Sequence, residues 1–196
     1  AYPRMLAADI QYLEGLGALV VFAPNEQEMY PASLEFTPMP LGKFGTLLEG
    51  AHRPGHFEGV VHVVHHLFEL IKPHKAYFGQ KDFQQLAIIR QLNSYYGFGI
   101  DIKGCQTIRE PDGLAMSSRN LRLNAEERQQ ALAISKALRY VQQQVGKLSI
   151  KETIREAIAI IENAGLILEY LAIVDPLTLE NCEAWQENQV CCVAAF

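Results

Sequence analysis

The stretch from residue 75 to residue 104 constrains the fold most strongly, because short apolar runs alternate there with a helical pattern. Residues 76–78 (Ala-Tyr-Phe) follow the helix breaker Pro73 and predict a short buried strand. Apolar side chains then recur at helical spacing over residues 82–96, and residues 100–104 predict another strand. Strands that alternate with helices predict a parallel sheet, and such sheets bind ligands at the carboxyl ends of their strands.

The other predicted elements fall into two parts of the chain. In order, the pattern predicts a helix over 5–17, a buried strand over 18–23, a short strand near 34–36, helices over 59–71, 124–145 and 149–165, and strands near 168–174 and 190–196. We expect an α/β domain with a parallel sheet over residues 1–108. A smaller α+β lid domain over residues 109–196 would follow it, hinged near residues 109–111.

The segment Gly79-Gln80-Lys81-Asp82-Phe83-Gln84-Gln85 joins the first of these strands to the next helix. We expect Gly79 to give the turn its freedom of φ, and Asp82 to cap the helix by accepting a hydrogen bond from a first-turn amide. The remaining amides, the helix dipole and the Lys81 ammonium would then bind an anion such as a phosphate. The alternative is that Lys81 is solvated and Asp82 only caps the helix.

A second polar segment, Asp112-Gly113-Leu114-Ala115-Met116-Ser117-Ser118-Arg119-Asn120, follows the turn former Pro111. A helix is then predicted to begin at Asn124, which with Glu127 is close to a capping box. The hydroxyl groups and the Arg119 guanidinium would lie on an exposed loop that can close over phosphates. Alone, the segment also suits an ordinary polar loop. Together, the two segments point to an enzyme that uses ATP.

Arg53 and His56 precede a predicted helix start, where an anion could bind, so we keep them as candidate ligands. His62 and His66 share a helix face and could in principle bind a metal. A polar stripe opposite an apolar one needs no metal, however, and the four cysteines show no metal-ligand spacing. We therefore name no metal ligand in this chain.

Composition excludes some classes of function. The net charge of −5 and the isoelectric point near 5.7 argue against nucleic acid as the main partner. No apolar stretch approaches the length of a membrane span, so no membrane partner is expected. Reduced thiols in the cytoplasm are the simplest account of the cysteines.

The two polar segments resemble signatures of the pantoate–β-alanine ligase family, also called the pantothenate synthetases. The first is similar to the family's G-E-K-D-[FY]-Q-Q, and the second to its D-G-L-A-M-S-S-R-N. Tyr2-Pro3-Arg4 resembles the family's Y-P-R, and residues 53–60 (Arg-Pro-Gly-His-Phe-Glu-Gly-Val) resemble its R-P-G-H-F-x-G-V. The resemblance runs from residue 1 to residue 196, and the two long motifs are highly specific as a pair.

The resemblance implies that residues 1–108 are the C-terminal part of a Rossmann-like domain that binds ATP and pantoate. It implies an ATP-dependent condensation in which pantoate's carboxylate attacks the α-phosphate, giving pantoyl adenylate and pyrophosphate. The amine of β-alanine would then displace AMP. The implied cofactors are ATP and Mg²⁺, bound as Mg·ATP, and the implied assembly is a homodimer.

The resemblance also implies roles for individual residues. Catalysis would involve Lys81 at the phosphates and a closing loop that carries Ser117, Ser118 and Arg119. The implied ATP ligands are Gly79, Gln80, Lys81, Asp82, Ile108, Met116, Ser117, Ser118 and Arg119. The implied pantoate ligands are Gln85, Val60, Val63 and Val64.

Two departures from the family pattern stand out. Gln80 replaces a usual glutamate and removes one negative charge beside the phosphates, with little effect expected if its side chain points away. The family's His-x-Gly-His signature, which grips the ATP phosphates, does not occur in the sequence. We therefore expect this chain to be a segment of a longer enzyme, unable by itself to make pantoyl adenylate at a useful rate.

Two other functions stay open at the level of sequence. The chain could belong to another adenylate-forming nucleotidyltransferase, although Gln85 and the valines argue for a pantoate pocket. It could also be a folding or dimerisation module without turnover. Binding of Mg·ATP to the isolated chain distinguishes the enzymes from the module.

Overall fold

The computed structural model describes residues 6–30 and 36–196, so the predicted contribution of Tyr2-Pro3-Arg4 lies outside the described residues. The helices are α1 (Leu6–Gly15), α2 (Glu26–Met29), α3 (Glu49–His52), α4 (His56–Ile71), α5 (Phe83–Tyr95), α6 (Ala125–Gln144) and α7 (Ile150–Glu162), with 3₁₀ turns η1 (Gly42–Gly45), η2 (Gln80–Asp82) and η3 (Ser118–Arg122). The strands are β1 (Lys75–Gly79), β2 (Asp101–Cys105), β3 (Leu168–Val174) and β4 (Val190–Ala195).

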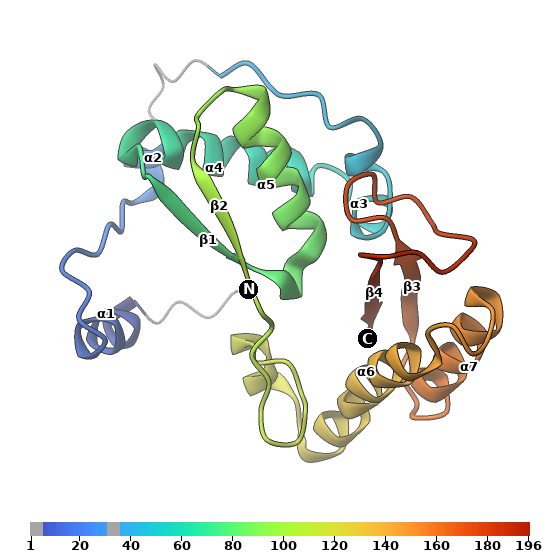
Figure 1. The fold of residues 1–196 in the computed structure, drawn as a ribbon. Helices are drawn as coiled ribbons and strands as arrows, with labels where there is room; N and C mark the ends of the chain where they lie inside the picture. The colour runs from blue at the N-terminus through green and yellow to red at the C-terminus, as the bar shows by residue number, and fades with distance from the viewer. Residues whose placement is uncertain (1–5, 31–35) are drawn as a thin grey trace.

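The first half of the chain is an α/β unit, as the sequence predicts. β1 and β2 pair in parallel, with Lys75 opposite Asp101 and Gly79 opposite Cys105. Helices α4 and α5 pack on each other and on this pair of strands, and they supply most of one hydrophobic core. Because both strands run the same way, their carboxyl ends point together toward the segment that leads into α6 (Figure 1).

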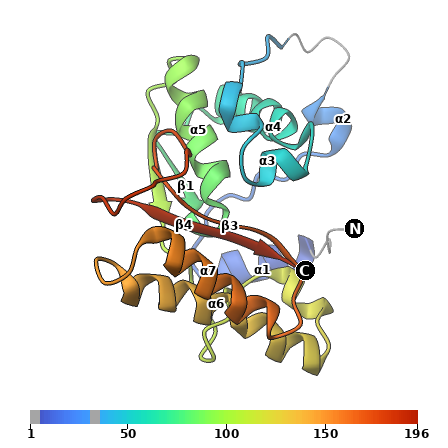
Figure 2. The same cartoon turned by 90° about the vertical axis from the view of Figure 1, so that its right-hand side faces the viewer.

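The second half is the predicted α+β unit. β3 and β4 are antiparallel, and α6 and α7 cover one side of them (Figure 2). Asn124 and Ser149 begin the two helices with complete capping boxes, to Glu127 and Glu152 respectively. The box that the sequence indicates at Asn124 is therefore confirmed, with asparagine in the place of serine or threonine.

The β3–β4 sheet joins the two halves, since its two faces pack against different partners. Leu171 and Ile173 face the α6–α7 layer, whereas Ala172 and Val174 pack on residues of the first half. The partners on that second side include Phe44, Leu47, Leu48, Phe83 and Ala87. Successive side chains of a strand point to opposite faces, so one short strand serves both cores. The second half of the chain thus packs on the start of α5.

Two predictions about elements are corrected, and a third lies mainly outside the described residues. Residues 18–23 form no strand, because no strand among residues 6–30 and 36–196 pairs with them. Within this run, the side chain of Leu19 is 97% exposed. The helix predicted over 59–71 begins earlier, at His56, after Gly55 turns the chain with φ +79°. The short strand predicted near 34–36 lies mainly outside the described residues, and Phe36 is irregular.

Candidate nucleotide site

Lys81 lies where the sequence places it, directly after β1 and ahead of α5. A 3₁₀ turn (η2) precedes the helix, so α5 begins at Phe83. The Lys81 ammonium nitrogen is 3.3 Å from a carboxylate oxygen of Asp82, and both side chains are exposed. The predicted cap is therefore wrong: the Asp82 side chain makes no capping hydrogen bond and pairs with Lys81 instead.

The reason for a glycine at position 79 also differs from the prediction. Gly79 has φ −71° and ψ 135°, an extended conformation that any residue adopts. A Cβ built on it would meet only one atom within reach, the Lys81 amide nitrogen at 4.0 Å. The protein itself therefore leaves open space over Gly79, two residues before Lys81. That space can admit a ligand close to the backbone.

The loop with Met116, Ser117, Ser118 and Arg119 is tied to its neighbours at both ends. On one side Arg109 and Ala115 form an antiparallel bridge, and Arg109 Nη1 donates to the Gly113 carbonyl oxygen at 3.1 Å. On the other side the Asn120 amide donates to the Ala115 carbonyl oxygen at 2.9 Å. Met116, Ser118 and Arg119 remain exposed.

The turn before this loop, at residues 111–114, packs against α6. Leu114 is buried against Ala131 and Leu132, and Arg128 donates to an Asp112 carboxylate oxygen at 2.7 Å. Gly113 has φ +96° and lies so close to α6 that a Cβ would come within 3.0 Å of an Arg139 nitrogen. Glycine is therefore required here, as the turn signal predicts. Residues 109–111, where the sequence predicts a hinge, belong to this hairpin, and the hinge itself stays a prediction.

Glu49, Arg53 and His56 form a cluster of charged and titratable side chains. Glu49 forms an ion pair with Arg53, and the His56 Nε2 atom is 4.0 Å from the same carboxylate oxygen. The pKa of His56 is lowered from 6.5, mainly by burial and then by the positive charge of Arg53, with opposing effects of Glu49 and Asp82 and a further lowering by Arg119.

The charges that act on His56 therefore indicate that both motifs lie near this histidine. Asp82 belongs to the first motif and Arg119 to the second, and the charge of each reaches the same imidazole. The burial of Tyr170 raises its pKa, and the carboxylates of Glu49 and Asp82 also act on this β3 residue. The site thus lies at the carboxyl end of β1, where the two halves of the molecule meet.

Two residues in this region escaped the sequence reasoning. Glu49 carries no motif of its own, and only the fold shows that its carboxylate pairs with both candidate anion ligands. Gln84 is 4% exposed and makes three hydrogen bonds to the chain around α3. The signal that could have found Gln84 is its place on one helix face with the apolar Ala87 and Ile88, where a buried polar side chain must be satisfied.

The remaining predicted residues lie as follows. Gln85 is half-buried next to Gln84. On α4, Val64 is buried in the first core, and Val60 and Val63 pack partly against it. Ile108 has an exposed side chain, and its carbonyl oxygen accepts a hydrogen bond from the Met116 amide at 2.9 Å. Gln80 is exposed, and its Cγ lies beside Gly104 of β2.

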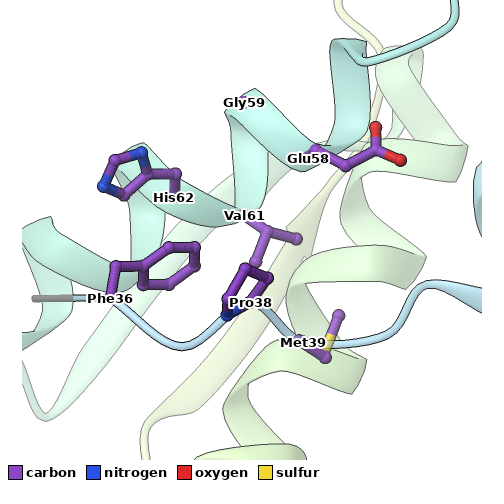
Figure 3. Close-up of a pocket in the computed structure, with 7 residues that line it drawn as sticks. All are labelled: Phe36, Pro38, Met39, Glu58, Gly59, Val61 and His62. Carbon is purple, nitrogen blue, oxygen red and sulfur yellow. The ribbon is translucent and has the colours of Figure 1, made fainter.

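A separate apolar hollow of about 330 Å³ lies on α4 (Figure 3). It is lined by Phe36, Pro38, Met39, Glu58, Gly59, Val61 and His62. His62 stacks on Phe36 with ring centroids 4.4 Å apart. This histidine therefore packs as an aromatic ring beside the hollow, and the hollow contains none of the residues predicted to bind ATP or pantoate.

No group of three or more His, Cys, Asp or Glu in residues 6–30 and 36–196 is arranged to hold a metal ion. The four cysteines are free thiols, and burial raises the pKa of Cys191 to about 12 and that of Cys192 to about 11. These two are therefore protonated and unreactive at neutral pH. Among the described helices, none is both long and apolar enough to cross a membrane.

Comparison with known proteins identifies the family of this chain. The family model described as pantoate–β-alanine ligase matches residues 1–196. Pantothenate synthetases from Bacteroides fragilis and Bacteroides thetaiotaomicron are 48% and 46% identical to this chain, and the alignments cover 100% of it and 70% of each relative.

Two solved structures are similar as well. The crystal structure of pantothenate synthetase from Thermus thermophilus has a TM-score of 0.95 and 39% identity, covering 100% of this chain and 71% of that one. The pantoate–β-alanine ligase from Francisella tularensis, complexed with β,γ-ATP and β-alanine, has a TM-score of 0.74 and 33% identity, covering 89% and 64%. The chain described here belongs to the pantoate–β-alanine ligase family.

Proposed function

We propose that this protein serves the ATP-dependent condensation of pantoate with β-alanine, through a pantoyl adenylate. One observation carries the proposal: the lysine segment follows directly on the carboxyl end of a parallel strand, and the charges of its Asp82 and of Arg119 in the Met-Ser-Ser-Arg loop act on the same imidazole, that of His56. Parallel sheets bind nucleotides at that edge. The open space over Gly79 supports it, since a ligand can approach the backbone there.

The chemistry has two steps. A carboxylate oxygen of pantoate attacks the α-phosphorus of ATP, and the bond to the bridging oxygen breaks so that pyrophosphate leaves with its electron pair. The β-alanine amine then attacks the acyl carbon, loses a proton, and AMP leaves. Charge builds on the phosphate oxygens in the first step, so preorganised cations and hydrogen-bond donors beside them lower the barrier.

The proposed roles follow from where each group lies. Lys81 would neutralise the phosphates, and the closing loop would add Ser117, Ser118 and Arg119. The pairing of Lys81 with Asp82 would be exchanged for pairing with phosphate when ATP binds. Arg53 and His56, held by Glu49, are candidates for a second anionic group of the substrates.

The other ligands are proposed from the family pattern and the fold. Gly79, Gln80 and Asp82 would lie along the nucleotide, with Ile108 and Met116 near its base. Gln85 would hydrogen-bond pantoate, and Val60, Val63 and Val64 would form the apolar wall, although Val64 is also part of the core. Mg²⁺ would arrive with ATP as Mg·ATP. A cytoplasmic homodimer is part of the same proposal, and sedimentation velocity measures the assembly.

Calorimetric titration of the chain with Mg·ATP tests the site. Loss of one charge-assisted contact is worth about 1.5–3 kcal/mol, so Lys81→Ala should weaken binding by roughly 10- to 150-fold. Lys147→Ala, an exposed lysine after α6, is the matched control and should bind like wild type. Equal affinity of wild type and Lys81→Ala would refute the role of Lys81.

Binding is the first measurement because the sequence lacks His-x-Gly-His, and we expect little adenylate formation by this chain alone. Absence of heat at millimolar Mg·ATP would favour the non-catalytic module. Pyrophosphate release that occurs with another carboxylic acid but not with pantoate would favour a different adenylate-forming enzyme.

A further inference from the structure

The amide of Gln84 is a buried junction at the start of α5. Its Nε2 donates to the carbonyl oxygens of Phe44 and Leu47, each at 2.8 Å, and its Oε1 accepts from the Glu49 amide at 3.0 Å. The side chain is 4% exposed. One amide group therefore satisfies three backbone groups of the segment that leads into α3, which lies beside α5 (Figure 1).

This junction leaves little room for movement. Gly50 follows the bonded Glu49, and a Cβ built on it would lie 2.5 Å from the Gly45 carbonyl oxygen and 3.3 Å from Gln84 Nε2. Phe44, Leu47 and Leu48 are packed with Phe83 and Ala87 of α5. The segment around α3 is thus held against the first turns of α5 by hydrogen bonds and by packing at the same point.

The segment so held carries the second charged group of the site. Glu49, whose amide donates to Gln84, pairs through its carboxylate with Arg53 and reaches His56. On the other side, Gln84 lies three residues after Lys81. Gln84 therefore connects two parts of the site. Along the chain it is three residues from Lys81, which would bind phosphate, and through Glu49 it is linked to Arg53 and His56, which would bind a second anionic group.

We propose that Gln84 is a positioning residue, which touches no substrate and sets the placement of Arg53 and His56 relative to Lys81. The proposal rests on the proposed function, because it matters for activity only if these cations bind substrate. The neighbouring Gln85, by contrast, is assigned to the substrate itself. The Gln-Gln pair would thus have two roles: one amide positions the site, and the other binds the substrate.

Asn93 offers a matched control on the same helix. Its amide also bonds to backbone, donating to the Ile100 carbonyl oxygen at 2.9 Å and accepting from the Ile100 amide at 3.0 Å. It lies near the opposite end of α5, away from Lys81. Asn93→Asp removes a half-buried donor, and Gln84→Glu removes a buried one, so both should lower stability. Only the Gln84 change should alter the site.

The experiment compares Gln84→Met, Gln84→Glu and Asn93→Asp in the 196-residue chain. The first readout is the pKa of His56 from an NMR titration, which needs no ligand. Loosening of α3 should uncover the ring and move this pKa upward toward 6.5 in Gln84→Met, a change that adds no charge. The value in Asn93→Asp should stay at that of wild type. The second readout is the affinity for Mg·ATP, which should fall about tenfold or more in both Gln84 variants only.

Each result of these measurements supports or overturns the positioning role of Gln84. An unchanged His56 pKa in folded Gln84→Met would overturn the positioning role, whatever the effect on stability. If Gln84→Met does not fold, Gln84→Glu replaces it, because this variant keeps the acceptor for the Glu49 amide. Its affinity for Mg·ATP is then compared with that of Asn93→Asp, and wild-type affinity in Gln84→Glu would overturn the positioning role. If wild type itself fails to bind Mg·ATP, the proposed function fails, while the His56 titration still decides whether Gln84 positions the cluster.

Discussion

Residues 18–23 (Ala-Leu-Val-Val-Phe-Ala) and β3 (Leu168–Val174) are both rich in apolar residues, and the sequence predicts a strand for each of them. Only β3 is one. In the first run Leu19 is 97% exposed, whereas in β3 Ile173 and Val174 are 2% and 0% exposed. The same local preference therefore has opposite outcomes within one chain.

The difference lies in what surrounds each run. β3 pairs with β4 along its length, packs on α6 and α7 through one face, and packs on the first half through the other. The run at 18–23 has no strand partner among the residues that the structure describes, so its backbone groups are left to water. Strand preference is chiefly a fit to neighbours, and it has no effect where neighbours are lacking.

The largest expected effect tests this comparison directly. Ile173→Ala should lower the free energy of unfolding by about 2–5 kcal/mol, because it leaves a cavity between β3 and the α6–α7 layer. Leu19→Ala should change it by no more than about 0.5 kcal/mol, because the side chain is already in water. Denaturant unfolding measures both. A loss of more than about 1 kcal/mol in Leu19→Ala would show that the first run is packed after all.

A smaller effect is expected from the layer that supports β3. Asn124→Ala removes the cap of α6, whose side chain accepts from the Glu127 amide at 2.9 Å, and should cost about 1 kcal/mol. Asn124→Asp should retain most of the stability, because aspartate caps equally well. Hydrogen exchange of the β3 amides, followed in parallel, shows whether the strand loosens with its supporting helix. Equal stability of the alanine variant and wild type would contradict the capping role.

The smallest expected effect is the pH dependence of the stability, which should differ between the two halves of the chain. Burial lowers the pKa of His65 from 6.5, against the raising effect of Glu69 and with the lowering effects of His66 and His62. The folded state therefore binds this proton less tightly than the unfolded chain. Stability from this group is complete above pH 6.5 and is lost as the pH falls from 6.5 through the folded pKa. His56 acts with the same sign.

Unfolding midpoints at about pH 7.5, 6.5 and 5.5 measure this dependence. His65→Gln should reduce the loss of stability between about pH 6.5 and 5.5 without abolishing it. The second half should be insensitive in this range, since the lowered pKa of Glu152, caused mainly by hydrogen bonding to Ser149, takes effect only at more acidic pH. The same pH slope in wild type and His65→Gln would exclude His65 as a source.

Much of the fold was predictable because most of its signals are local. The helical repeat over α5, the capping residues of α6 and the turn at Gly113 depend on neighbours within a few residues. The lysine segment and the Met-Ser-Ser-Arg loop were likewise recognisable as motifs. The capping role of Asp82 was wrong because a carboxylate next to a lysine has a competing partner, which capping preference does not weigh.

The sequence by itself determined the order of most elements, the α/β and α+β halves and the membership of the family, since these depend on local patterns and on motifs read along the chain. Tertiary structure alone decided that residues 18–23 pair with no strand among the described residues, that Glu49 lies near both Arg53 and His56, and that Gln84 joins α3 to α5. The physical reason is that pairing, burial and charge coupling depend on distance in space. Residues as far apart in sequence as Glu49 and Gln84 come close only when the chain has folded.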